Sequence, residues 1–201
     1  SEKFHGAVVD HAGHDRTRVF GDVADVGAVL ERLAPVLGAG VAARVAIIYD
    51  WENRWALEGA QGLLQGDKGY WDACLDHYRA FWQRGVPVDV IDMEQEPARY
   101  DLVIAPMLYM VRPGVAERLS AWVAAGGTLV ATYWSGVVDE NDLCFLGGFP
   151  GPLRDLLGVW AEEIDALTPD DENCVAIAPD TPLGLAGTYR ARDLCELIHA
   201  E

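Results

Sequence analysis

Residues 44–56 read R-V-A-I-I-Y-D-W-E-N-R-W-A, and this stretch decides the fold. Val45 to Tyr49 form an unbroken apolar run, rich in β-branched residues and as long as a strand. A run without polar alternation is typical of a strand covered on both faces, as in a parallel sheet between helices. In such sheets, functional residues gather in the loops that follow the carboxyl ends of the strands. We therefore expect residues 50–55 to form a loop that carries function.

The composition of this expected loop disfavours two kinds of site. It has no glycine and opens with the carboxylates of Asp50 and Glu52, whereas a phosphate cradle needs free backbone N–H groups and no nearby negative charge. A glycosidase needs two carboxyls that face one bond across roughly 5 to 9 Å. We expect the side chains of Asp50 and Glu52 to point apart, so this loop predicts neither a nucleotide site nor a glycosidase pair.

The remaining apolar runs repeat a strand–helix order. This order predicts an α/β fold with a mostly parallel sheet in a three-layer α/β/α arrangement, and a strand order of 2-1-3-4 would make it flavodoxin-like. We expect 87–93 to lie toward a sheet edge, because it alternates, and 128–132 to be buried. The expected strands are 45–49, 87–93, 101–106, 128–132 and, in the tail, 174–178; the expected helices are 21–37, 67–84 and 113–125.

Composition limits which classes of partner the chain can bind and indicates its cellular compartment. The chain has 201 residues, 51% of them hydrophobic, which is enough for one well-cored domain. Its net charge of −17 repels nucleic-acid phosphates and anionic lipid, so we expect neither nucleic acid nor membrane as a partner. The four cysteines lie far apart without a C-x-x-C pair, which favours buried free thiols in a reducing cytoplasm.

The sequence contains no complete active site. The turn after residues 101–106 reads Met107-Leu108-Tyr109 and offers no nucleophile, and no G-x-S-x-G motif occurs. The histidines near the start lack the spacing of a helical zinc pair, and the acids of 139–142 lack the spacing of a calcium loop. We expect no metal and no cofactor.

Aromatic residues collect at the expected carboxyl edge instead. Such residues suit protein interfaces and also sugar faces, and they could equally cap the core. Residues 137–154 form a long apolar loop with several glycines and prolines, and loops of this length usually contact a partner or a ligand. From area and location we select four candidate interface anchors: Trp51, Trp55, Trp134 and Phe149.

Three long motifs occur in a familiar order. I-I-Y-D-W-E-N-R-W-A (47–56), T-Y-W-S-G-V-V-D-E-N-D (132–142) and L-G-G-F-P-G-P-L-R (146–154) together resemble the middle domain of glycoside hydrolase family 42 β-galactosidases. The resemblance implies a domain with the class I glutamine amidotransferase-like fold, without amidotransferase chemistry, that serves for trimerisation. It places the catalytic glutamates in a preceding (β/α)₈ barrel that this chain does not contain.

The first residues resemble the segment that leaves that barrel. E-K-F-H (2–5) and H-A-G (11–13) match it, although Asp10 stands where the family often has proline. By resemblance, Glu2 and His5 match residues that contact galactose hydroxyls in the full-length enzyme. We expect residues 1–20 to be a remnant of the barrel and linker, and 21–201 to be the α/β trimerisation domain.

The resemblance therefore predicts a piece of a longer β-galactosidase, which hydrolyses terminal β-galactosides. The chain should form a homotrimer, and it should be inactive alone because the catalytic barrel is missing. Galactosides should bind only to the full-length enzyme. The alternative is a carbohydrate-binding module that uses the aromatic edge of the sheet.

Overall fold

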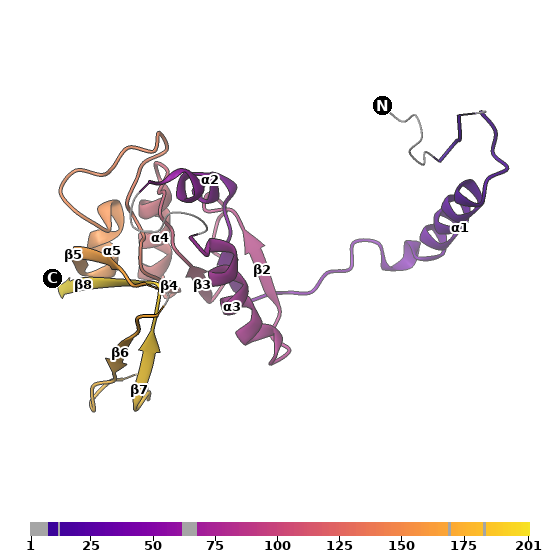
Figure 1. Ribbon diagram of the computed structural model, residues 1–201. Helices are drawn as coiled ribbons and strands as arrows, with labels where there is room; N and C mark the ends of the chain where they lie inside the picture. The colour runs from indigo at the N-terminus through magenta and orange to yellow at the C-terminus, as the bar shows by residue number, and fades with distance from the viewer. Residues whose placement is uncertain (1–7, 12, 62–67, 169, 183) are drawn as a thin grey trace. The chain divides into compact units, whose positions relative to one another are not determined.

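The computed structural model describes residues 8–11, 13–61, 68–168, 170–182 and 184–201 (Figure 1). Glu2 and His5 lie outside the described residues. The chain divides into two compact units, of which the first ends at Val41 and the second begins at Ala42.

The first unit consists of α1, Arg18–Arg32, and the short 3-10 helix η1, Ala34–Val36. The helix starts before the expected Gly21, because the Thr17 side chain caps it by accepting a hydrogen bond from the Phe20 N–H. The expected apolar spacing is present, yet no residue of α1 is buried. Within the described residues of the first unit, no element buries the hydrophobic stripe of this helix.

The second unit is built on a four-stranded parallel sheet in the order β2-β1-β3-β4. This confirms the expected strand order and the position of β2 at an edge. Strand β4 lies at the other edge and is half-exposed, so the expectation of a buried strand was wrong. The strands are β1, Val45–Ile48; β2, Val88–Ile91; β3, Leu102–Ala105; and β4, Thr128–Ala131.

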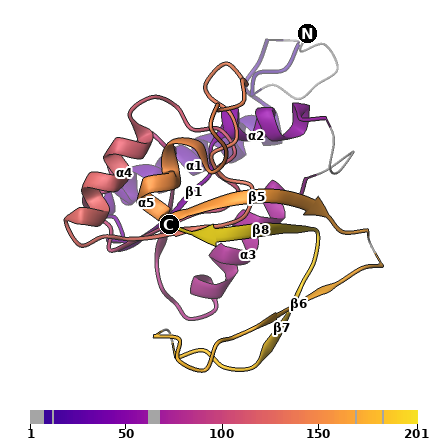
Figure 2. The ribbon, with the colours of Figure 1, turned by 90° about the vertical axis from the view of Figure 1, so that its left-hand side faces the viewer.

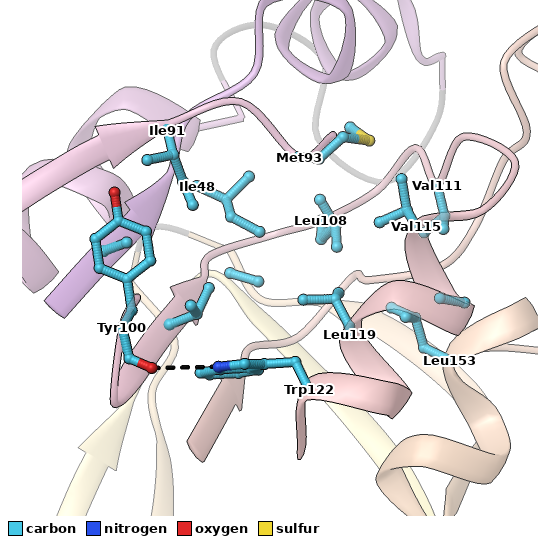
Figure 3. Packing of buried hydrophobic residues seen from close by; sticks show 14 residues of the cluster. Ile48, Ile91, Met93, Tyr100, Leu108, Val111, Val115, Leu119, Trp122 and Leu153 are labelled. Carbon is cyan, nitrogen blue, oxygen red and sulfur yellow. Dashed lines mark hydrogen bonds between the residues drawn. The ribbon is translucent and has the colours of Figure 1, made fainter. Parts of the chain in front are cut away.

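Helices cover both faces of this sheet and make three layers. The helix α3, Tyr70–Trp82, packs on the face that presents Ile47 and Ile104. The helix α4, Val115–Ala124, packs on the opposite face (Figure 3), where Trp122 Nε1 donates to the carbonyl of Tyr100 at 3.2 Å. Because side chains alternate along a strand, the continuous apolar run of β1 supplies both cores.

The end of the chain adds two small antiparallel sheets that the sequence only partly indicated. Strand β6 confirms the strand expected near 174–178, whereas β5, β7 and β8 were not anticipated. Figure 2 shows β5 and β8 side by side, with β6 and β7 continuing beyond them. The elements are η2, Gly151–Leu153; α5, Arg154–Leu157; β5, Val159–Ala166, paired with β8, Leu194–Ala200; and β6, Asn173–Ala176, paired with β7, Thr188–Ala191.

The long loop after β4 is held in place by backbone contacts. Val138 bridges both Met110 and Cys144, and the Gly136 N–H donates to the Leu108 carbonyl at 2.8 Å. A Cβ on Gly136 would lie 1.9 Å from the carbonyl oxygen of Pro150. The loop therefore folds back closely on its own start, and only glycine fits at the crossing.

Candidate functional site

The residues expected to form a loop after β1 instead begin a helix. Helix α2 spans Trp51–Gly59, and Asp50 is its N-cap, with a side chain that accepts from the Asn53 N–H at 2.9 Å. Residues 50–55 contain an N-cap carboxylate, an acid in the first turn and no glycine or proline, all of which favour a helix start. The loop expectation was wrong, because we weighted position after a strand above this capping pattern.

Asn53 ties α2 to the turn after β3. Its side chain is fully buried; Nδ2 donates to the Met107 carbonyl at 3.0 Å, and Oδ1 accepts from the Met110 N–H at 2.8 Å. Buried amides with both ends bonded stabilise one geometry, since an unpaired buried polar group costs about 1–3 kcal/mol. The turn after β3 and the start of α2 therefore form one block.

Arg112 joins the segments after three strands. Its guanidinium lies 2.7 Å from Asp50 Oδ2, 2.6 Å from Glu52 Oε2, 3.1 Å from Asp92 Oδ1 and 3.3 Å from Glu94 Oε2. Asp50 follows β1, the 92–94 pair follows β2, and Arg112 itself follows β3. The expectation that Asp50 and Glu52 point apart was wrong, because both carboxylates bind this one arginine.

The charges of the cluster around Arg112 favour a structural role over a catalytic one. Desolvation raises the pKa of Asp50, against the opposing effects of the Asn53 N–H and of Arg112. Desolvation lowers the pKa of Arg112, but its interactions with Asp50, Glu52 and Asp92 together outweigh this and raise the pKa overall. A pocket of about 290 Å³ opens here, lined by these charged groups with Trp51 and Trp55. Within the described part of the chain, no group of histidine, cysteine and acidic side chains is arranged to hold a metal.

The turn after β3 holds no free reactive group. Met107 lies there with a φ of 43° and a fully buried side chain. Its N–H donates to Thr132 Oγ1 at 2.8 Å, and the Leu108 N–H donates to Ser135 Oγ at 3.1 Å. An oxyanion hole needs free donors aimed at a reacting oxygen. Both of these donors are already bound by side chains that follow β4.

The carboxyl edge of the sheet also presents exposed aromatic side chains. Trp51 and Trp55 are 56% and 60% exposed, with ring centroids 6.3 Å apart. Tyr49 links them to the next helix, because its ring lies 5.7 Å from that of Trp51 and 5.6 Å from that of Trp71. The sequence indicated Trp51 and Trp55 as candidate anchors; it did not indicate Trp71, whose helical position suggested core.

The other two candidate anchors lie differently. Trp134 is only 5% exposed and packs edge-on against Tyr109, with centroids 5.3 Å apart, so the expectation that its ring lines the exposed edge was wrong. It has a φ of 57°, and its N–H donates to Glu196 Oε1 at 2.6 Å. Phe149 is partly buried against the same core. Their part in an interface stays a prediction.

Arg112 is the residue that sequence reasoning missed. Its partners lie 18 to 62 positions away in the chain, so spacing gives no signal. The only available hint was a charged residue directly after a buried strand and its turn.

Comparison with known proteins identifies the domain. The family model described as "Beta-galactosidase trimerisation domain" matches residues 43–201. The chain belongs to this family. The match begins within two residues of the start of the second compact unit and covers the whole of it from there.

Relatives and solved structures agree with the family. The chain is 64% identical over 200 residues to the β-galactosidase BglY of Alicyclobacillus acidocaldarius and 58% identical over 201 residues to the β-galactosidase Pbg of Clostridium perfringens. All of this chain is covered in both comparisons, but only 29% of each relative. The crystal structure of a β-galactosidase from Rahnella sp. R3 matches with a TM-score of 0.81 and 60% identity, over 99% of this chain and 29% of that one.

The trimerisation domain therefore spans less than a third of the β-galactosidases it resembles. Among the helices of the described residues, none is both long and apolar enough to cross a membrane.

Proposed function

We propose that this chain assembles as a homotrimer and acts as the non-catalytic oligomerisation domain of a β-galactosidase that hydrolyses terminal β-galactosides. One observation carries the proposal. The carboxyl edge of the sheet, where α/β enzymes keep their reactive groups, has its polar groups bonded to one another and leaves tryptophan rings exposed. Exposed aromatic residues beside a polar rim are typical of protein interfaces.

The same geometry argues that the chain lacks chemistry of its own. Asp50 and Glu52 both bind the guanidinium of Arg112, and the backbone donors after β3 are occupied. We infer that the domain is an amidotransferase-like scaffold in which Met107 takes the place of a nucleophile. The catalytic barrel of the parent enzyme supplies the reaction. Residues 1–20 of this chain are the proposed remnant of that barrel and its linker, and Glu2 and His5 are the proposed galactoside contacts in the full-length enzyme.

The four cysteines support a reducing, cytoplasmic location. All four are free. Cys74 is buried as expected, but Cys144 and Cys174 are exposed, so the expectation of buried thiols was wrong for these two. Exposed thiols that remain unpaired are typical of proteins kept away from oxidising compartments.

Light scattering coupled to size-exclusion chromatography tests the proposal. A homotrimer has three times the 21.9 kDa mass of the single chain. A monomeric mass at all concentrations used would refute self-assembly by this chain. The carbohydrate-binding alternative, which the family match does not favour, predicts that galactose shifts the tryptophan fluorescence saturably.

A further inference from the structure

An apolar groove lies between α3 and the edge strand β2. It has a volume of about 230 Å³, and its lining includes Tyr49, Trp71, Cys74, Leu75, Tyr78 and Val90. Val90 points from the middle of the edge strand and is 60% exposed, while Trp71 at the groove's rim is 54% exposed. Exposed apolar side chains around a hollow of this kind mark interaction sites on soluble proteins.

The tryptophans that neighbour the groove present nearly half of the area that one partner buries in a stable interface. Trp51, Trp55 and Trp71 are each more than half exposed. Since a tryptophan buries about 150–250 Å², these three rings present on the order of 300–400 Å². A stable interface removes roughly 800 Å² per partner from water, so this surface supplies nearly half of it before Val90 is included.

A ring of three copies needs a second, different surface on each copy. In a trimer with threefold symmetry each contact is heterologous, because one patch of a copy meets another patch of its neighbour. The second patch must therefore carry a projection that suits an apolar groove, and it must lie elsewhere on the same unit.

The long loop after β4 carries such a projection at Leu146. This side chain is 98% exposed, although its neighbour Phe145 packs against the core. The Phe145 N–H donates to the Val137 carbonyl at 3.0 Å, and Arg154 donates to the Gly147 carbonyl at 3.3 Å. Leu146 is thus presented on a backbone that is already fixed on both sides, which lowers the entropy cost of binding.

Placement and charge favour a contact between copies. The loop follows β4 and the groove borders β2, which are opposite edges of the sheet, and Figure 1 shows the loop on the side of this unit away from β2. Copies with a net charge of −17 repel one another, so they need uncharged surfaces to meet. Residues 143–149 contain no charged side chain, and neither does the lining of the groove.

We propose that Leu146 of one copy inserts into the groove between α3 and β2 of the next copy. This contact repeats head to tail around the trimer. The proposal rests on the proposed homotrimer and adds which two surfaces meet.

The experiment uses two opposed variants and light scattering. Leu146→Asp removes the projection, and Val90→Asp places a charge in the groove; each variant alone should fall from the mass of three chains to that of one. Mixed in equal amounts, they should form a species of twice 21.9 kDa, because each pair keeps one intact projection and one intact groove. The control Leu185→Asp, at a leucine that is 47% exposed elsewhere, should leave the wild-type mass unchanged.

The outcomes separate this inference from the proposed function. A monomeric wild type refutes both. A trimeric wild type with an unaffected Leu146→Asp variant, or variants that stay monomeric when mixed, overturns the groove contact alone. Circular dichroism checks that each variant is folded, and Trp71→Asp replaces Val90→Asp if the edge strand does not tolerate the charge.

Discussion

Replacing Arg112 with methionine should destabilise the domain far more than the loss of an ordinary ion pair. The Asp50 side chain is fully buried and that of Arg112 is 11% exposed, so the change leaves a carboxylate buried without its cation. Removing one partner of a buried pair costs about 3–5 kcal/mol. With a urea m-value of about 2 kcal/mol/M, the unfolding midpoint should fall by roughly 2 M.

Arg44→Met is the matched control. Arg44 also binds an aspartate, Asp101, but the two side chains are 70% and 62% exposed. Exposed pairs contribute about 0–1 kcal/mol. Urea unfolding followed by tryptophan fluorescence should therefore separate the two variants by at least 2 kcal/mol. Equal losses would refute the reasoning that burial of Asp50 decides the cost.

The free energy of unfolding that Arg112→Met loses should also depend on pH. The pKa of Asp50 is raised in the folded chain, mainly by desolvation, so the folded state holds this proton more tightly than the unfolded state does. Stability from this group therefore falls as pH rises above the ordinary aspartate pKa of about 3.9. Without Arg112 the pKa rises further. The deficit of Arg112→Met should be largest at pH 7 and shrink toward pH 4, and adding Asp50→Asn should restore part of the stability at pH 7.

Three further predictions concern single positions. Gly136→Ala should prevent stable folding, because its Cβ would meet the Pro150 carbonyl oxygen at 1.9 Å and its φ is 65°; thermal unfolding checks this, and an unchanged midpoint would contradict it. Met107→Cys should give no hydrolase activity, and in the native state no labelling by a thiol reagent beyond that of the wild type, since that position is fully buried. In the wild type, Cys144 should react quickly with the same reagent and Cys74 only after unfolding, because burial raises the pKa of Cys74 to about 12.

The sheet was predictable because its signal is local. The unbroken apolar run of β1 and the alternation of β2 determine which strand is central and which is at an edge. The prediction failed at β4, where Leu129 to Ala131 are apolar but the strand is half-exposed. An apolar run indicates that a strand can be buried. Whether that strand lies at an edge depends on whether strands pair on both sides of it in the same sheet, and among the described strands only β3 pairs with β4.

The candidate site was predictable only in its location. Trp51 and Trp55 are exposed where they were expected, but the same argument placed Trp134 at the exposed edge. A left-handed residue in the turn after β4 directs the chain so that this indole packs against Tyr109. Turn conformation of this kind at a tryptophan has no sequence signature, because residues other than glycine and asparagine rarely adopt it.

The polar bonds of the carboxyl edge also bear on assembly. Arg112 connects the segments after β1 and β2, and Asn53 connects α2 to the turn after β3. Thr132 and Ser135, which follow β4, bind the same turn. All four strand ends are thus joined into one block, and α2 carries Trp51 and Trp55 on that block. Association of a rigid surface loses less conformational entropy than association of mobile loops. We therefore predict that Arg112 acts as a positioning residue for the proposed homotrimer. Arg112→Met should raise the dissociation constant of that trimer under conditions in which circular dichroism still reports a folded chain.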